Sequence, residues 1–195
     1  MKVPRETPLG RRLASFGVLL RERAIPLGLV AEGDRDRLWE RHIEDCLRAR
    51  AAFRSEDRVV YDLGSGAGLP GIVLACALPD RRFHLIEPRH RAVAFLELTV
   101  ERLALENVEV LMARVQDLSE PADVVTARTF APFERAWAAA FPLLRRGGRL
   151  VYFAGEGLED PAAHARALST PEPPEEVEVI EPVDSWGPLV IMSRG

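Results

Sequence analysis

A glycine-rich segment at residues 62–71 carries the residue types and spacing that most clearly predict chemistry. It reads Asp-Leu-Gly-Ser-Gly-Ala-Gly-Leu-Pro-Gly and directly follows the apolar run at residues 59–61. Glycines allow a backbone to turn sharply and to approach a ligand closely. Proline is tolerated in the first turn of a helix, where the free N–H groups can face a ligand. The segment therefore predicts a cofactor-binding loop between a strand and a helix.

Two kinds of cofactor fit this loop. Gly66, Gly68 and Gly71 match the G-x-G-x-x-G spacing of dinucleotide-binding enzymes, and Glu87 lies 21 residues beyond Gly66. The D-x-G-x-G-x-G pattern of S-adenosylmethionine-dependent methyltransferases also matches and includes Asp62, whose carboxylate can accept from the methionine ammonium or its waters. A pyrophosphate offers no partner for that carboxylate, so the loop favours S-adenosylmethionine. A dinucleotide enzyme and a non-binding glycine-rich turn are the alternatives.

Two charged side chains stand at the ends of later apolar runs, which is where open α/β sheets bind their ligands. Glu87 is followed by Pro88, and its carboxylate can accept hydrogen bonds from both hydroxyls of a ribose. Arg128 follows the run at residues 124–127 and can contact a methionine carboxylate or a substrate phosphate. The competing interpretations are a solvated glutamate at a strand end and an arginine in a structural ion pair.

The segment at residues 113–117 is expected to border the adenine of the cofactor. Main-chain groups near Val115 can read the adenine edge, with Gln116 or Asp117 facing the exocyclic amine. An ordinary surface helix start is the alternative. The cofactor-binding residues expected from the whole sequence are Asp62, Gly64, Ser65, Gly66, Gly68, Leu69, Glu87, Pro88, Arg114, Val115, Gln116 and Arg128.

Short apolar runs that alternate with helical patterns surround these residues and predict the elements that position them. Such alternation is typical of βαβ units and a mostly parallel sheet covered on both faces. Two final runs without a helical pattern between them predict an antiparallel hairpin at one edge, after a solvated loop at residues 170–176. The expected strands are 59–61, 83–87, 108–112, 124–127, 148–153, 177–180 and 189–192, and the expected helices are 69–78, 91–105 and 131–144.

Two further helical patterns precede this α/β region. Residues 11–24 place four large apolar side chains on one stripe, and Asp34 can cap a second helix that reaches Phe53. Pro26 and Gly28, residue types typical of turns, lie in the connection between them. We therefore expect a helical extension at residues 1–56 and a cofactor-binding domain at residues 57–195.

Composition and charge favour some classes of protein over others. A chain of 195 residues with 47% hydrophobic residues fits one α/β domain with a modest extension. All basic residues except Lys2 are arginines, and arginine makes bidentate contacts with phosphate, which suits an RNA partner. Cys46 and Cys76 show no metal spacing, so no metal is expected. No apolar run approaches the ~18–20 residues of a membrane span, and we expect no membrane partner and a cytoplasmic protein.

Four segments resemble signatures of one known family. Residues 41–47 (Arg-His-Ile-Glu-Asp-Cys-Leu) resemble its R-H-I-x-D-S-L, and residues 62–72 resemble its D-x-G-[ST]-G-x-G-[LF]-P-G-[IL]. Residues 127–131 resemble its S-R-A-F/V-A, and residues 91–96 resemble its K-R-x-x-F-L. This is the GidB, or RsmG, group of 16S ribosomal RNA guanine-N7 methyltransferases. The resemblance covers roughly residues 35–155.

The resemblance implies a class I (Rossmann-like) methyltransferase fold, S-adenosylmethionine as cofactor, and methyl transfer to N7 of a guanine. The implied partner is 16S rRNA or the small ribosomal subunit, and we expect a monomer. The resemblance also makes His42 and Arg128 the expected catalytic residues, although spacing alone favours a structural role for His42. The alternatives are a small-molecule methyltransferase, a nicotinamide-dependent oxidoreductase, and a cofactor-binding module without catalysis.

The chain departs from the family pattern at three places. Residues 25–30 stand where the family has an N-L-T motif, Ala154-Gly155 stand where it has Lys-Gly, and Gln116 replaces an acidic residue. These departures fall partly where RNA would be handled. They leave the expected cofactor site intact.

Overall fold

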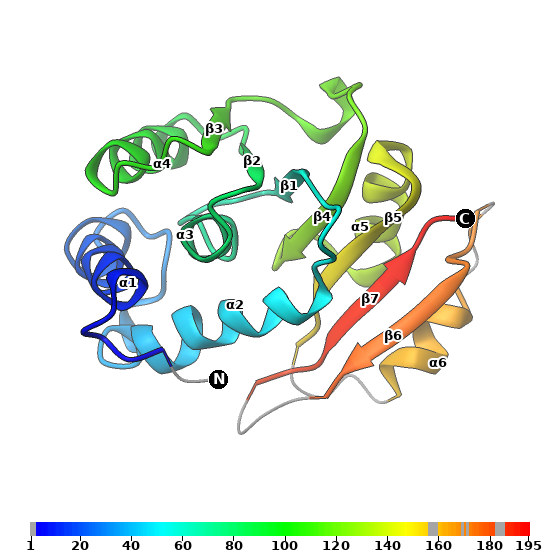
Figure 1. Cartoon of the computed structure of the whole chain (residues 1–195), viewed down its shortest axis with the longest axis horizontal. Coiled ribbons are helices and arrows are strands. Elements are labelled where there is room, and N and C mark those ends of the chain that lie inside the picture. The colour runs from blue at the N-terminus through cyan, green and yellow to red at the C-terminus, as the bar shows by residue number, and fades with distance from the viewer. Residues whose placement is uncertain (1–2, 156–159, 169, 171, 182–185) are drawn as a thin grey trace.

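One seven-stranded sheet organises the computed structural model, which describes residues 3–155, 160–168, 170, 172–181 and 186–195 (Figure 1). The strand order is β3-β2-β1-β4-β5-β7-β6, and the first five strands in this order are parallel. β7 runs antiparallel to both β5 and β6, which confirms the expected hairpin edge. The strands are β1 (Val59–Leu63), β2 (Arg82–Ile86), β3 (Val108–Leu111), β4 (Ala122–Arg128), β5 (Leu144–Phe153), β6 (Glu176–Ile180) and β7 (Leu189–Ser193).

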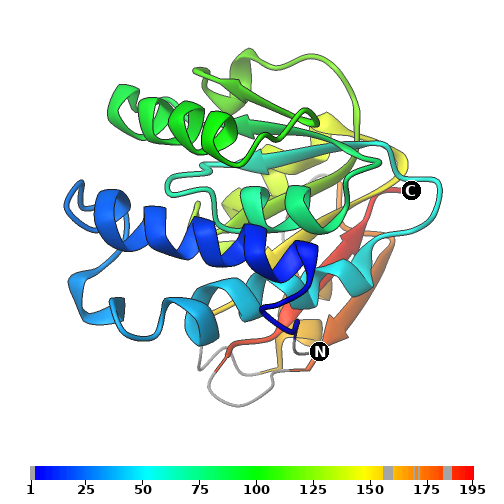
Figure 2. The same cartoon turned by 60° about the vertical axis from the view of Figure 1, so that its left-hand side comes forward.

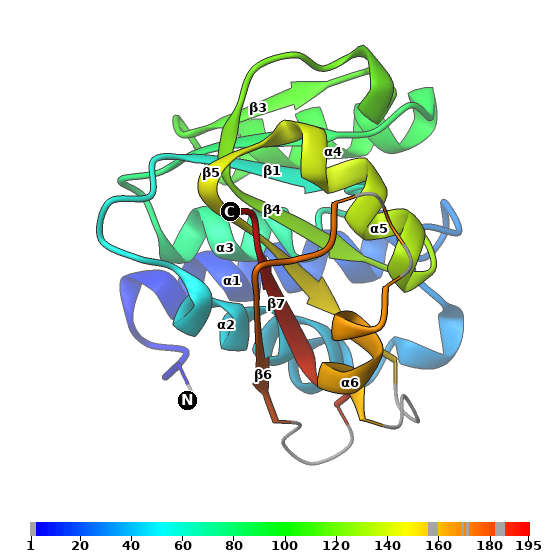
Figure 3. The ribbon, with the colours of Figure 1, turned by 90° about the vertical axis from the view of Figure 1, so that its right-hand side faces the viewer.

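Helices cover both faces of this sheet. Figure 3 shows α5 and α6 in front of the sheet, with α1, α2 and α3 behind it. The segment Leu38–Glu44 is also helical and runs directly into α2, so the two form one continuous helical stretch. The α-helices are α1 (Pro8–Leu19), α2 (Asp45–Arg48), α3 (Gly71–Ala77), α4 (His90–Arg102), α5 (Phe133–Ala140) and α6 (Pro161–Arg166).

Alternate side chains of the strands enter different cores, as the two-residue period of a strand requires. In β1, Tyr61 and Leu63 join the cluster beneath α5 and α6, whereas Val60 faces α3 on the other side. All three residues are at most 3% exposed. Both faces of the central strand are therefore buried, which explains why this segment reads as a continuous apolar run rather than an alternating one.

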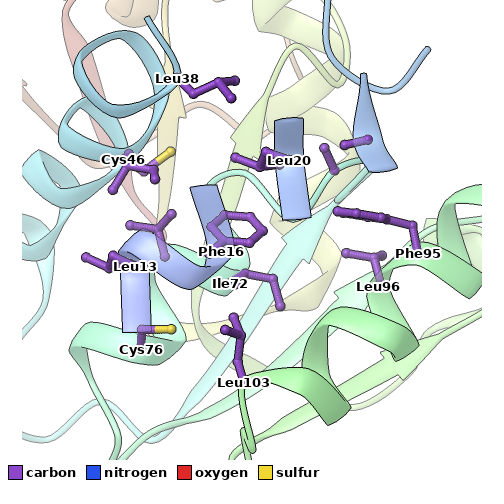
Figure 4. Close-up of a cluster of buried hydrophobic side chains, with 14 of the residues drawn as sticks. Leu13, Phe16, Leu20, Leu38, Cys46, Ile72, Cys76, Phe95, Leu96 and Leu103 are labelled. Atoms are coloured by element: carbon purple, nitrogen blue, oxygen red, sulfur yellow. The ribbon is translucent and has the colours of Figure 1, made fainter. Parts of the chain in front are cut away.

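The N-terminal helices pack against the face that carries α3 and α4 (Figure 2). Leu13, Phe16 and Leu20 are fully buried in one cluster with Ile72 and Leu96 (Figure 4). Burying side chains of this size stabilises the fold by about 1.5–3 kcal/mol each. We therefore propose that residues 1–56 are an extension whose apolar stripe closes the core of the domain at residues 57–195.

One local expectation was wrong, and one helix was missed. Asp34 does not cap the second helix, because the helical stretch begins at Leu38 without a side-chain cap and the Asp34 carboxylate binds other partners. The helix α6 was not expected, although Asp160 caps it and Pro161 occupies its first turn, a common signal for a helix start. In the loop expected at residues 170–176, residue 171 lies outside the described residues, and Glu176 already begins β6.

Among the described residues, no helix is long and apolar enough to cross a membrane. In the same part of the chain, no group of three or more His, Cys, Asp or Glu side chains could hold a metal ion. Cys46 and Cys76 are buried free thiols, and burial raises the pKa of each to about 12.

Candidate functional site

The glycine-rich loop connects β1 to α3 with a backbone that only glycine adopts readily. Gly64, Gly66 and Gly68 have φ values of +65°, +54° and +82°. A Cβ atom added at Gly64 would lie 2.8 Å from Phe130, and one added at Gly68 would lie 2.5 Å from Ile72. The alternating glycines therefore serve both the turn itself and the close packing of the loop against its neighbours.

Asp62 supports this loop from beneath. Its carboxylate is buried and accepts hydrogen bonds from Thr126 Oγ1 at 2.7 Å and from the Gly71 N–H at 3.2 Å. The Ser65 hydroxyl donates to the Asp62 carbonyl at 2.9 Å. Burial raises the pKa of Asp62 to about 6, against the hydrogen bonds from Thr126, Ser65 and Gly71. The carboxylate thus ties β1 to β4 and to the start of α3.

The Asp62→Asn variant tests this buried carboxyl. The pKa is 3.8 in an unfolded chain and about 6 in the folded protein, so between these values only the folded state keeps the proton. Wild-type stability should therefore fall by up to about 3 kcal/mol as the pH rises from about 4 to about 7. Asparagine does not titrate. In urea unfolding, the free energy of unfolding of the variant minus that of the wild type should rise by this amount between pH ~4 and pH ~7. A difference that does not change with pH would contradict the raised pKa of Asp62.

Two cavities meet at Gly64. The larger, about 700 Å³, has mainly apolar walls and contains Pro88, Arg114, Val115 and Gln116 among its lining residues. The smaller cavity, about 360 Å³, is lined on one side by the glycine-rich loop and on the other by residues near the N-terminal helices. The expected site residues that line it are Gly64, Ser65, Gly66, Leu69, His42 and Arg128. Most of the residues expected from the sequence are therefore brought together.

Glu87 lies between these cavities without lining either. Its side chain is 1% exposed and accepts from the Gly66 N–H at 2.9 Å and from Arg89 Nε at 2.9 Å. Burial acts to raise the pKa of Glu87, but the hydrogen bonds from Arg89 and Gly66 hold it below its ordinary value. The Arg89 side chain is 65% exposed and lines the smaller cavity. Sequence reasoning missed Arg89, although it lies only three residues after the end of β2.

Arg128 is held by partners from the helical stretch that contains α2. Its Nη2 lies 2.9 Å from His42 Nδ1 and 3.4 Å from Asp45 Oδ2. Since a guanidinium can only donate, His42 Nδ1 accepts, and the proton of the neutral ring lies on Nε2. That nitrogen is 3.0 Å from Asp34 Oδ2, to which it donates. Burial, followed by the charge of Arg128, lowers the pKa of His42 below 6.5, which favours this neutral form.

Asp34 and Asp45 were not expected as members of the site. The sequence predicted Asp34 as a helix cap, but its carboxylate instead accepts from His42 and pairs with Arg41 at 3.2 Å. Asp45 is 7% exposed and accepts from Arg48 Nη2 at 2.6 Å. The position of Asp45 in the Arg-His-Ile-x-Asp segment is the sequence signal that could have marked it as a site residue. Both carboxylates orient cationic side chains around Arg128.

Asp34→Ala should lower the kcat/KM of the activity expected from the sequence roughly 10-fold, because His42 loses the acceptor that fixes its tautomer and Arg128 becomes less well oriented. The matched control is Asp36→Ala, two residues away and exposed. Initial rates and thermal unfolding of both variants should be compared. An equal loss of activity in the two variants, or none in Asp34→Ala, would show that Asp34 does not position Arg128.

Comparison with known proteins places the chain among methyltransferases. Residues 11–181 match the family model GidB, described as rRNA small subunit methyltransferase G. The chain belongs to this family. It is 39% identical to "Ribosomal RNA small subunit methyltransferase G" of Thermobifida fusca, with 89% of this chain and 72% of that protein covered. The protein of the same name from Clavibacter sepedonicus is 40% identical, with 89% of this chain and 81% of the relative covered.

Solved structures share the fold of this GidB member. "Cofactor-bound Rv0187 from MTB" aligns with a TM-score of 0.62 and 21% identity, covering 97% of this chain and 93% of the other. "M. jannaschii TYW2 in complex with AdoMet" aligns with a TM-score of 0.59 and 22% identity, covering 79% and 76%. The family, the class I fold and the S-adenosylmethionine-dependent methyltransferase class expected from the sequence are thus confirmed.

Proposed function

We propose that this chain transfers a methyl group from S-adenosylmethionine to N7 of a guanine in 16S rRNA. The observation that carries the proposal is the family match over residues 11–181. The two cavities that meet at Gly64 support it, because the adenosine and methionine parts of the cofactor need adjoining apolar and polar spaces. S-adenosylmethionine, when bound, supplies a methyl group activated by a positively charged sulfur.

The residues expected from the sequence hold the cofactor in this proposal. Val115 and its neighbours border the adenine, and the loop around Gly66 faces the methionine. Glu87 accepts from the ribose hydroxyls once the exposed side chain of Arg89 turns away. Asp62 acts from beneath by shaping the loop. The proposed set is Asp62, Gly64, Ser65, Gly66, Gly68, Leu69, Glu87, Pro88, Arg114, Val115, Gln116 and Arg128.

The acceptor atom explains why no general base is required. Guanine N7 carries a lone pair and no proton, so catalysis reduces to holding N7 in line with the methyl group and the sulfur. Arg128 orients the substrate from the cavity beside the loop. His42 is engaged at both ring nitrogens, so it acts by fixing Arg128 rather than by moving a proton.

We also propose a partner, an oligomeric state and a cellular location for the enzyme. The substrate is 16S rRNA, free or in the small subunit, and the enzyme is a cytoplasmic monomer that needs no metal and no membrane. Arginine contacts to RNA phosphates should make substrate binding weaken steeply with salt. A small-molecule methyltransferase is the second candidate, because Ala154-Gly155 lack the lysine of the family pattern.

Transfer of labelled methyl from S-adenosylmethionine to intact 30S subunits and to deproteinised 16S rRNA tests the proposal. Label on at least one of the two is expected. Absence of label on both would reject the rRNA function and favour a small-molecule acceptor or a non-catalytic binding module.

A further inference from the structure

A third cavity, about 500 Å³, opens on the other side of Arg128. Its walls come from three separate parts of the chain: the helical stretch around α2, the ends of β4 and β5, and the residues that precede β7. Arg128 and Thr129 line both this cavity and the smaller one beside Gly66. A molecule in the third cavity therefore lies next to whatever occupies the cavity of the glycine-rich loop.

The residue at this junction has a strained backbone. Thr129 has a φ of +52°, a region that β-branched residues rarely adopt. Its hydroxyl donates to the Arg128 carbonyl at 2.7 Å. Such conformations persist where the surrounding structure imposes them, and they concentrate at functional sites. The strain lies at the point where the two cavities adjoin.

Guanidinium groups and aromatic rings are combined in the walls. The Arg48 guanidinium lies 5.2 Å from the centroid of the Trp186 ring, and that of Arg128 lies 5.9 Å from the Phe153 ring. Arg41 also lines the cavity, and 42% of its side chain is exposed. Nucleotides combine a phosphate, which attracts arginine, with a planar base, which stacks on aromatic faces. The chemistry of the walls matches that combination.

Trp186 is held in place by contacts on its neighbour. The Gly187 carbonyl accepts from Arg48 Nη2 at 2.8 Å, and a Cβ atom at Gly187 would lie only 2.1 Å from the Ala154 carbonyl oxygen. Only glycine permits this close approach to the end of β5. Asp45 accepts from the same Arg48, so the arginine beside the indole is itself fixed. The aromatic wall is thus anchored to α2 and β5.

We propose that this cavity holds the acceptor nucleotide, with its base stacked on Trp186 and its phosphate near Arg41. This inference rests on the proposed function, since it assigns the place of the rRNA nucleotide. Stacking on Trp186 and the position of Arg128 between the two cavities hold the base edge toward the methyl donor. Trp186 is accordingly a substrate-binding residue that no sequence motif marks.

Trp186→Ala in the full chain tests the assignment. Base–aromatic stacking predicts a KM for 30S subunits raised roughly 5- to 150-fold. Trp186→Phe, which keeps an aromatic face, should recover most of this loss. The affinity for S-adenosylhomocysteine, measured by calorimetry, should not change in either variant. Trp39→Ala is the matched control, since Trp39 is only partly buried, contacts Arg5 and Glu44, and does not line the cavity.

An unchanged KM in Trp186→Ala, or an equal rise in Trp39→Ala, would overturn the assignment. A second measurement separates this outcome from failure of the rRNA function. Guanosine 5′-monophosphate should quench the tryptophan fluorescence of the wild type saturably, and Trp186→Ala should lose that quenching. If 30S subunits receive no methyl group, the quenching experiment still decides whether the cavity binds a nucleotide. Quenching in the wild type that is lost in Trp186→Ala supports the site. No quenching in the wild type, or equal quenching in both proteins, rejects the site.

Discussion

Arg128→Ala should reduce kcat/KM for methyl transfer to 30S subunits roughly 100- to 1,000-fold. The guanidinium lines both the cavity of the glycine-rich loop and the cavity assigned to the acceptor nucleotide. Removing a preoriented donor from a reacting centre typically has an effect of this size. Stability should fall by only about 1–2 kcal/mol, because Asp45 keeps its hydrogen bonds from Arg48.

Two further variants separate chemistry from folding. Arg128→Lys keeps the charge but loses the planar guanidinium, whose Nη2 contacts both His42 and Asp45 and whose Nη1 donates to Cys46 Sγ. Its activity should therefore lie between those of the wild type and Arg128→Ala. Arg145→Ala removes an arginine that pairs with Asp123 at 2.6 Å and is 48% exposed, and its activity should stay within about twofold of the wild type. Parallel losses of activity and stability in Arg128→Ala would mark Arg128 as structural.

Gly66→Val should abolish cofactor binding. A Cβ atom at Gly66 would meet no atom nearer than 3.6 Å, so the added side chain enters the smaller cavity instead of clashing with the protein. The substitution fills space that the ligand needs. It also places a β-branched residue at a φ of +54°, which costs about 1–2 kcal/mol of stability. Calorimetry should detect no binding of S-adenosylhomocysteine.

Gly147→Val supplies the control for backbone strain. Gly147 has a φ of +73°, and an added Cβ atom would meet nothing within 4 Å. This variant should lose a similar amount of stability in urea unfolding and still bind S-adenosylhomocysteine with wild-type affinity. Wild-type affinity in Gly66→Val would contradict the place given to the cofactor, and loss of binding in both variants would attribute the effect to folding.

The sheet and the glycine-rich loop could be predicted because their signals are local. Buried parallel strands appear as short apolar runs, and the loop requires glycines at fixed positions such as Gly64 and Gly68, whatever the surroundings. The starts of the helices were less well predicted, since α6 is short and α3 begins two residues later than expected. Local patterns specify the kind of element better than its ends.

The rest of the site depends on contacts between distant parts of the chain. Asp34 has the sequence context of a helix cap, and only the fold brings His42 and Arg41 to its carboxylate. Trp186 stands outside every motif and gains its place from Arg48, which is 138 positions earlier in the sequence. Asp62 was expected to face the ligand, yet its carboxylate turns into the fold to meet Thr126 and Gly71. A one-dimensional pattern does not specify the partners of such residues, and for Trp186 it gives no signal at all.

Nucleoside analysis of methylated 16S rRNA shows whether the chain transfers the methyl group to N7 of guanine. After incubation of 30S subunits with the wild-type chain and labelled S-adenosylmethionine, the RNA should be digested and separated by chromatography with mass detection. The label should be recovered as 7-methylguanosine, and Arg128→Ala should give a strongly reduced yield. Label in any other nucleoside, or in no ribosomal RNA at all, would contradict the proposed methyl transfer to guanine N7.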